Sequence, residues 1–296
     1  MNKLTLDDRA LFDKYLGSSR HNLSVFSFPG IYIWRPLFDI CWAASDGNLC
    51  VFFTDRLSRF MYLPPLGRRP GSAILKSVFS VMDEVNKNRD ISRIENIEEE
   101  ERGIYLNLGC CCCRKYPDYV CLRDSLASLK GNKFKPQRAL RNHFLKNQDS
   151  RVRKLAEQDK QECLGLFDRW SGARREKYRE ALYCGMLEDS RKVIEEAFSC
   201  YKSLGLEGIA VTIEGKIKGF TFGYRLNRDT FCVLYEITDL SVKGLAQFIF
   251  SEFSISLKGY KYINIMDDSG LENLRKTKLS YKPERLIEAY IATRNA

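Results

Sequence analysis

The sequence predicts an α/β protein built from two repeated halves, each with a mixed sheet flanked by helices. Helical and strand patterns alternate along the 296 residues, which is typical of this class. Hydrophobic residues make up 44% of the chain, a normal content for a packed protein long enough for two ordinary domains. The third observation is an internal repeat, which we justify element by element.

The first half begins with two amphipathic stretches, 7–16 and 25–34, which we expect to be helices. A hairpin is predicted over 38–53, because Asp46-Gly47 stands between two apolar runs and this dipeptide is a strong turn signal. The remaining elements are a strand, a helix and a short strand, at 59–67, 71–85 and 90–97.

The second half repeats this order. Helices are expected at 158–170 and 175–202, followed by a hairpin over 208–226 whose turn at Glu214 lies 168 residues after Asp46. The helix start at 244 follows its counterpart at 71 by 173 residues, and position 263 follows position 91 by 172. Three features at nearly one spacing indicate two copies of one unit. The later elements of this half are a strand, a helix and a strand, at 230–239, 244–257 and 261–268.

The predicted domains are an N-terminal one over 1–125 and a C-terminal one over 151–296, joined by a basic segment over 126–150. Between Lys130 and Lys154, nine Lys or Arg stand against the single acid Asp149, a net +8 out of +10 for the whole chain. Interspersed acids would be expected if this charge only kept the protein soluble. We therefore favour a polyanionic ligand, either tRNA or another nucleic acid, or an anionic membrane surface.

The basic segment contains a predicted helix that begins at Pro136, a residue suited to the first helical position. We expect this helix to turn its apolar side inward, with Leu140, Phe144 and His143, and to turn Gln137, Arg138 and Arg141 outward. The candidate ligand contacts in the segment are Lys130, Lys133, Arg138, Arg141 and Asn142.

The eleven cysteines, an odd number in a chain of this length, fit a reducing compartment. Because no apolar run is long enough to span a membrane and the N-terminus lacks the pattern of a secretory signal, we expect a cytoplasmic protein. The run Cys110–Cys113 has only Cys121 and His143 nearby as further ligands, so no metal site is predicted.

The C-terminal stretch YINIMDDSGLENLRKTKLSYKPERLIEAYIA, residues 262–292, carries the most specific pattern. Its residues Asn264, Asp268, Gly270, Leu274-Arg275-x-x-Lys278-Leu-Ser-Tyr281-x-Pro283 and Tyr290, together with LKGNKF, Arg138, Asn142 and Phe144 in the basic segment, resemble the C-terminal domain of phosphatidylglycerol lysyltransferases. The resemblance extends to the soluble bacterial proteins related to that domain, and it runs with gaps from about Asp7 to Tyr290.

This resemblance implies two tandem GNAT-like (N-acetyltransferase-like) domains, in agreement with the repeat. It also implies an acyltransferase similar to the Fem peptidyltransferases. Such an enzyme takes an aminoacyl group from aminoacyl-tRNA and transfers it to an amine or hydroxyl of a lipid head group, a peptide or a small molecule.

The resemblance implies a site as well. Lys278 resembles the cation that stabilises a tetrahedral oxyanion, and Arg275, one helical turn earlier, could clamp a phosphate or carboxylate. Glu236 and Asp268 could act as a base or bind an ammonium group, and Asn264 and Tyr281 would contact substrate. A solvated helix face, or a structural ion pair of Glu236 with Lys278 or Arg275, stays open as the alternative.

Two other functions also remain open. The turn at 241–246, SVKGLA, could place the N–H groups of Lys243 and Gly244 on the pyrophosphate of coenzyme A, although Ser241 stands where Arg or Gln is usual. Ile237, Ile265 and Met266 replace charged residues of the family pattern, which favours a catalytically reduced protein that binds a polyanion or a partner.

Overall fold

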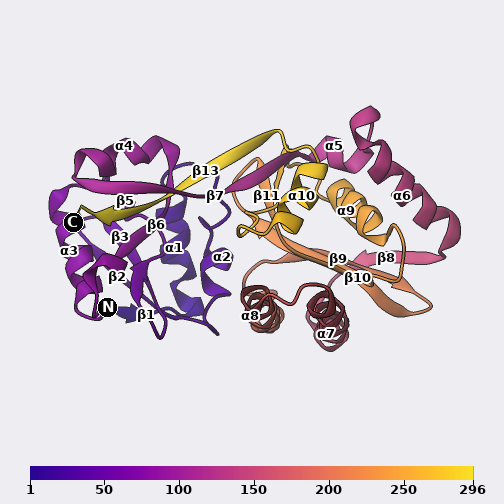
Figure 1. Cartoon of the computed structure of the whole chain (residues 1–296), viewed down its shortest axis with the longest axis horizontal. Coiled ribbons are helices and arrows are strands. Elements are labelled where there is room, and N and C mark those ends of the chain that lie inside the picture. The colour runs from indigo at the N-terminus through magenta and orange to yellow at the C-terminus, as the bar shows by residue number, and fades with distance from the viewer. Residues whose placement is uncertain (296) are drawn as a thin grey trace. The chain divides into compact units, whose positions relative to one another are not determined.

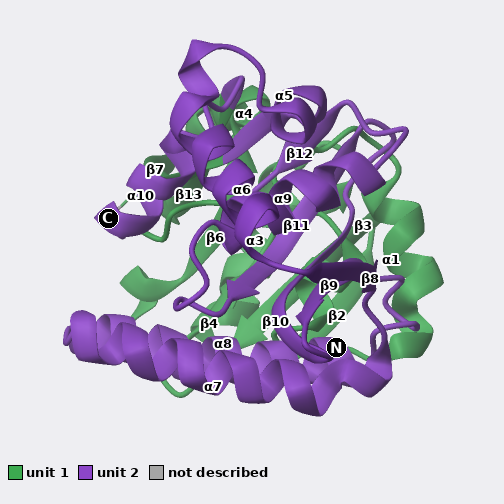
Figure 2. Cartoon of the chain, turned by 90° about the vertical axis from the view of Figure 1, so that its right-hand side faces the viewer, with its two compact units in different colours: residues 1–118, 267–270, 286–296 green, residues 119–266, 271–285 purple. Residues whose placement is uncertain are grey.

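The computed structural model describes residues 1–295, which form two compact units (Figure 2). Unit 1 contains residues 1–118, 267–270 and those from 286 onward, and unit 2 contains residues 119–266 and 271–285. The units differ from the predicted ranges 1–125, 126–150 and 151–296 in two places. Residues 119–150 belong to unit 2, and the residues from 286 onward belong to unit 1, where the last strand pairs with another strand.

Unit 1 is a mixed sheet with helices. Its helices are α1 (Arg9–Leu16), α2 (Phe28–Tyr32), α3 (Ser72–Asp83) and α4 (Glu99–Asn107), with short 3-10 helices at Leu6–Asp8 and Arg89–Ile91. Its strands are β1 (Asn2–Lys3), β2 (Asp39–Ser45), β3 (Asn48–Thr54), β4 (Arg59–Met61), β5 (Leu66–Gly67), β6 (Arg93–Glu98), β13 (Arg285–Arg294) and the first part of β7 (Cys110–Leu122). They follow the order β1-β2-β3-β4-β6-β13-β7, in which β4 and β6 are parallel.

Unit 2 has the same kind of architecture. Its helices are α5 (Arg123–Ser128), α6 (Lys135–Asn147), α7 (Lys160–Lys177), α8 (Ala181–Ser199), α9 (Leu245–Ser256) and α10 (Glu272–Ser280), with 3-10 helices at Asn132–Phe134 and Glu157–Asp159. Its strands are β8 (Ser150–Lys154), β9 (Glu207–Ile213), β10 (Lys216–Arg225), β11 (Thr230–Thr238), β12 (Tyr262–Asn264) and the end of β7, in the order β7-β12-β11-β10-β9-β8. Helices α7 and α8 lie on one face of this sheet, and α6 and α9 lie on the other (Figure 1).

The predicted repeat is confirmed down to the backbone of its turns. In the β2–β3 hairpin Asp46 and Gly47 have φ of 53° and 80°, and in the β9–β10 hairpin Glu214 and Gly215 have 52° and 78°. Two consecutive positive φ values are those of a type I′ turn. Each copy then continues with a strand, a helix and a second strand parallel to the first, β4-α3-β6 and β11-α9-β12.

Helix α6 begins beside Pro136 as predicted, but Gln137 and His143 lie on the opposite sides from those predicted, and Arg138 and Arg141 are half-buried rather than exposed. Gln137 is buried because its amide donates to the Ser280 carbonyl at 2.8 Å, whereas His143 is exposed. The helix is held by Phe144, which is fully buried and stacks on Phe248 of α9 with ring centroids 4.5 Å apart. Burial of a Phe side chain stabilises a fold by about 2 to 3 kcal/mol.

Candidate active site

The candidate site lies in unit 2, where two parallel strands stop pairing. β11 and β12 are in register from Thr230 with Tyr262 to Cys232 with Asn264. β12 then ends, whereas β11 continues to Thr238. The final residues of β11 therefore lack a strand partner on the β12 side, at the carboxyl ends of parallel strands, where ligands commonly bind in α/β sheets.

Asn264 explains why the pairing stops. Its side chain is fully buried, and its Oδ1 accepts a hydrogen bond from the Met266 N–H at 2.7 Å. This turns the chain, and Met266 adopts a left-handed φ of 62°. The segment still bonds to β7, from the Ile265 N–H to the Tyr119 carbonyl at 2.9 Å. Asn264 thus shapes the site through the backbone, and its predicted contact with substrate stays a prediction.

Lys278 reaches this turn from α10. Its Nζ donates to the carbonyl oxygens of Ile265 and Met266, the latter at 3.1 Å, and lies 5.9 Å from the centre of the Tyr119 ring. Because the side chain is half-buried and held by backbone acceptors, its ammonium is a fixed positive charge at the end of β12.

Glu236 is the acid on the unpaired part of β11. It is half-buried, and burial raises the pKa of its carboxyl to about 8. Among residues 1–295 no Lys or Arg forms an ion pair with it, so the predicted structural pair with Lys278 or Arg275 is not made. Functional carboxyl groups commonly have a raised pKa and no compensating cation, so that they are protonated near neutral pH.

Tyr281 and Cys121 lie near Glu236 and Lys278 and interact electrostatically with them. The Tyr281 ring is buried against Phe250, with centroids 4.6 Å apart, and its pKa is raised by burial and then by the charge of Glu236. The Cys121 Sγ lies 4.0 Å from the Tyr281 carbonyl oxygen, and burial raises the pKa of this thiol to about 12 although Lys278 opposes the shift. Cys121 and Tyr119 were not predicted for the site, because only the pairing of β7 with β12 brings them there.

Two further predicted residues lie elsewhere. Asp268 packs in unit 1, where it is buried and its Oδ1 accepts from the Gly270 N–H at 3.0 Å. Arg275 is exposed on α10, and no ion pair joins it to the described residues. Neither arrangement tests a role in catalysis.

The turn proposed for coenzyme A is shaped by packing. Gly244 has φ of 85°, and a Cβ there would lie 2.1 Å from the Leu140 carbonyl oxygen, so glycine is required for α6 to approach. Asp239 at the same turn pairs with Lys218 at 2.9 Å. Although burial opposes it, hydrogen bonds from Lys218 and Ser241 lower the pKa of Asp239 to about 2. A pyrophosphate near the exposed Lys243 would therefore meet a carboxylate.

Some cations between Lys130 and Lys154 bind other groups of the protein, and others are exposed without an ion pair to the described residues. Arg138 donates to the carbonyls of Leu129 and Gly131, and Arg141 pairs with Glu252 at 3.1 Å. Both are half-buried, which corrects the expectation that they point outward; Asn142 is exposed. The exposed cations that form no ion pair with any of residues 1–295 are Lys130, Lys133, Lys135, Lys146, Arg151 and Lys154.

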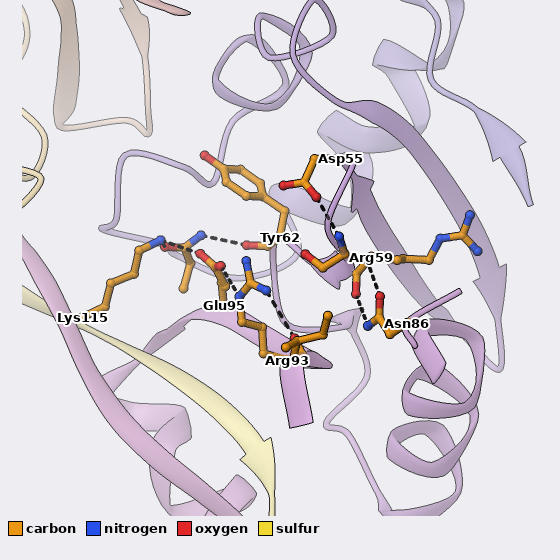
Figure 3. Close-up of polar contacts among 10 residues, drawn as sticks. Asp55, Arg59, Tyr62, Asn86, Arg93, Glu95 and Lys115 are labelled. Atoms are coloured by element: carbon orange, nitrogen blue, oxygen red, sulfur yellow. Dashed lines mark hydrogen bonds and ion pairs between the residues drawn. The ribbon is translucent and has the colours of Figure 1, made fainter. Parts of the chain in front are cut away.

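In unit 1, side chains of the unit itself fill the space beyond the end of the parallel strand pair β4 and β6, which corresponds to the site beyond β11 and β12 (Figure 3). Beyond the parallel pair of Met61 with Ile94, the Asn96 amide donates to the Tyr62 carbonyl at 2.8 Å. Next to it, Glu95 accepts from Lys115 and from Arg93, each at 2.7 Å. Burial opposes ionisation of Glu95, but the two cations outweigh it and lower the pKa.

Within the described part of the chain, no three His, Cys, Asp or Glu side chains are grouped so that they could hold a metal ion. The helices over the same residues are all too short or too polar to cross a bilayer.

The sequence matches the family model described as phosphatidylglycerol lysyltransferase, C-terminal, over residues 19–293. The chain belongs to this family. A conserved protein of unknown function from Bacteroides thetaiotaomicron is 30% identical, with a TM-score of 0.87 and coverage of 99% of this chain and 98% of that one. No curated protein matches the sequence at a significant level.

More distant structures share the fold. The L-PGS structure from Bacillus licheniformis is 16% identical, with a TM-score of 0.66 and coverage of 97% and 92%, and FemX is 9% identical, with a TM-score of 0.61 and coverage of 98% and 97%. The same fold occurs in a tandem GNAT protein, which confirms the predicted pair of GNAT-like domains. Family and fold together indicate an acyltransferase.

Proposed function

We propose that this family member transfers an aminoacyl group from aminoacyl-tRNA to an amine or hydroxyl acceptor, with Glu236 as the general base. The observation that carries the proposal is the position of Glu236, on the unpaired end of β11 and with a pKa of about 8. A general base works best when its pKa lies near the operating pH.

The proposed reaction uses the groups around that carboxylate. An acceptor amine is protonated at neutral pH and must lose a proton before it attacks the ester carbonyl, and Glu236 takes this proton. The attack builds a tetrahedral oxyanion, which the fixed charge of Lys278 stabilises. When the intermediate collapses, the C–O bond to the tRNA breaks and its 3′ hydroxyl leaves with a proton. Tyr281 stays protonated because its pKa is raised, so its hydroxyl can donate that proton and then regain one from the protonated Glu236, which restores both groups.

The donor would be held by the basic segment. Six exposed cations between Lys130 and Lys154 form no ion pair with any of residues 1–295 and suit the phosphates of tRNA, and each phosphate contact releases counterions. Lys130 and Lys133 are among them, whereas Arg138 and Arg141 support the local fold. A tRNA donor would place the reaction in the cytoplasm; the acceptor is a lipid head group, a peptide or a small molecule.

The structure bears on both alternatives. Asp239 and the close approach of α6 at Gly244 argue against coenzyme A at that turn. The substitutions Ile265 and Met266 are compatible with catalysis, because these residues bind Lys278 through their carbonyl oxygens rather than their side chains. Ile237 is buried, so it contributes to packing.

Donor binding can be tested by a salt titration of the protein with uncharged tRNA, aminoacyl-tRNA and coenzyme A, read by fluorescence anisotropy. We expect salt-sensitive binding that prefers aminoacyl-tRNA. Lys133→Glu with Lys146→Glu should weaken it and reduce the slope of log K against log salt by about 0.7 to 0.9 for each lost phosphate contact. The matched control, Lys76→Glu with Lys87→Glu in unit 1, should leave it unchanged. Tight binding of coenzyme A alone would select the alternative donor.

Catalysis needs a separate test. Lys278→Ala should remove turnover of aminoacyl-tRNA by about 100-fold or more while the donor Kd stays within twofold. Equal losses of turnover and binding would mean that Lys278 only supports the fold of the segment after β12.

A further inference from the structure

Unit 1 contains a cluster of a serine, a histidine and a carboxylate that the proposed transfer does not use. The Ser19 Oγ lies 2.8 Å from Nε2 of His21, and Nδ1 of the same ring lies 2.9 Å from Oε2 of Glu98. A nucleophile, a base and a group that orients the base are thus joined in that order.

The base and its carboxylate are rigidly placed. Glu98 ends β6 and precedes α4, and its Oε1 accepts from the backbone N–H groups of Asn22 at 2.7 Å and Leu23 at 3.2 Å. The His21 ring stacks on Phe26 with centroids 4.0 Å apart. Glu98 and His21 are only 6% and 8% exposed, so water competes little for their hydrogen bonds.

The hydrogen-bond pattern suits general-base chemistry. An ionised Glu98 can only accept, so Nδ1 of His21 carries the proton and Nε2 is left to accept the Ser19 hydroxyl proton. Ser19 itself is exposed and can be reached by a large substrate.

We infer that Ser19, His21 and Glu98 form a serine-type site that hydrolyses carboxylic oxygen esters. The Ser19 Oγ attacks the ester carbonyl while His21 takes its proton. The C–O bond to the alcohol then breaks, and His21 gives the proton to the departing oxygen. Water attacks the acyl-serine with His21 again as the base, which releases the acid and restores the serine hydroxyl.

The charge around the cluster indicates which esters it accepts. Glu98 begins a run of four acids that continues through Glu101, whose buried Oε2 has no hydrogen-bond partner among residues 1–295. Glu99 and Glu100 are the exposed acids of this run, and Arg102 pairs with Glu99 at 3.7 Å, so the net charge here is negative. An acyl group that carries an ammonium is attracted to these acids, whereas one that carries a carboxylate is repelled. The site should therefore prefer aminoacyl esters.

The same hydrogen bonds could serve only to anchor the loop between α1 and α2, and reactivity distinguishes the two roles. The first measurement is covalent labelling of the full-length protein by a fluorophosphonate probe, with the labelled residue located by peptide mass spectrometry. The second is the hydrolysis of p-nitrophenyl acetate, of a glycine p-nitrophenyl ester and of a succinate p-nitrophenyl ester.

The variants are Ser19→Ala and His21→Gln, with Ser18→Ala as the matched control. Ser18 is an exposed neighbour whose hydroxyl donates to the Tyr15 carbonyl at 2.6 Å and not to a histidine. Because Ser19 is exposed, Ser19→Ala should unfold at the same temperature as the wild type.

We expect labelling at Ser19 and faster hydrolysis of the glycine ester than of the succinate ester. Ser19→Ala and His21→Gln should each reduce hydrolysis by about 100-fold or more, and Ser18→Ala should not. The proposal is overturned if the wild-type Ser19 is not labelled, or if folded Ser19→Ala hydrolyses the esters as fast as the wild type does.

Discussion

The two repeats contain a carboxyl group beside the same parallel strand pair, but in opposite surroundings. In unit 1, Glu95 accepts from two cations and its pKa is lowered (Figure 3). In unit 2, Glu236 forms no ion pair with the described residues and its pKa is raised to about 8. The same fold can thus hold one carboxyl group in ion pairs and leave another buried without one, which shifts their pKa values in opposite directions.

Glu95 lies on the second strand of its pair, β6, and Glu236 on the first, β11, but the turn beside each acid is at an equivalent place. Asn96 and Met266 lie 170 residues apart, and both adopt a left-handed φ, of 58° and 62°, just after the parallel pair. In unit 1 the Asn96 side-chain amide donates a hydrogen bond to the Tyr62 carbonyl. In unit 2 the Met266 carbonyl accepts a hydrogen bond from Lys278.

The largest expected effect is on turnover. Glu236→Gln removes the proposed base and should reduce kcat by about 10² to 10⁴-fold while the protein stays folded. Glu95→Gln, the matched change in the other repeat, should leave kcat within about twofold. Steady-state aminoacyl transfer checks both, and similar losses in the two variants would show that neither acid is the base.

A smaller effect is expected on stability. Lys115→Met leaves Glu95 paired, among the described residues, with Arg93 alone, so the free energy of unfolding should fall by about 1 to 3 kcal/mol. Lys192→Met, which removes an exposed pair with Asp189 at 3.8 Å, should change it by less than about 0.5 kcal/mol. Urea denaturation measures both; equal changes would mean that the cluster around Glu95 contributes no more than a surface ion pair.

The two acids should also give opposite dependences of stability on pH. Between pH 5 and 8 the folded protein keeps the Glu236 proton that the unfolded chain loses, so this group lowers stability as pH rises. Relative to the wild type, Glu236→Gln should gain about 3 kcal/mol over that range. Glu95 contributes stability above its unfolded pKa that is lost in acid, so the deficit of Glu95→Gln should shrink below about pH 4. Denaturation at several pH values would contradict this if both differences were flat.

The smallest effect concerns the two hairpin turns. Gly47→Ala and Gly215→Ala each force Ala to a φ near 80°, which costs about 1 kcal/mol. At Gly47 the new Cβ would also lie 2.9 Å from Nε of Arg68, whereas at Gly215 no described heavy atom beyond its chain neighbours comes within 4 Å. The Tm of Gly47→Ala should therefore fall further; the reverse order would mean that the Arg68 side chain moves aside at no cost.

Local signals in the sequence predicted most of the elements, because hairpin turns and helical periodicity are properties of neighbouring residues. The elements that were not predicted include α4, β7 and β13, together with the short β1, α5 and β8. β13 pairs with β6 about 190 residues earlier, and β7 starts with four cysteines that show no alternation. Such strands are defined by partners far away in the sequence.

The site was predictable to a similar degree. Glu236 interrupts an apolar strand, which made it a candidate, and its raised pKa agrees with that signal. The sequence could not show that Lys278 would be held by two carbonyls, since these belong to a turn that Asn264 creates. Nor could it separate Arg138 and Arg141, which support the fold, from the exposed lysines beside them.

The return of β13 to unit 1 has a consequence for synthesis. Residue 286 leaves the ribosome 168 residues after residue 118, a delay on the order of 10 s at typical elongation rates. Until then the edge of β6 that will pair with β13 is open, so the first repeat cannot complete its sheet before the second repeat has been synthesised. A nascent chain truncated before residue 286 would keep that edge exposed, and open edges invite pairing with other chains.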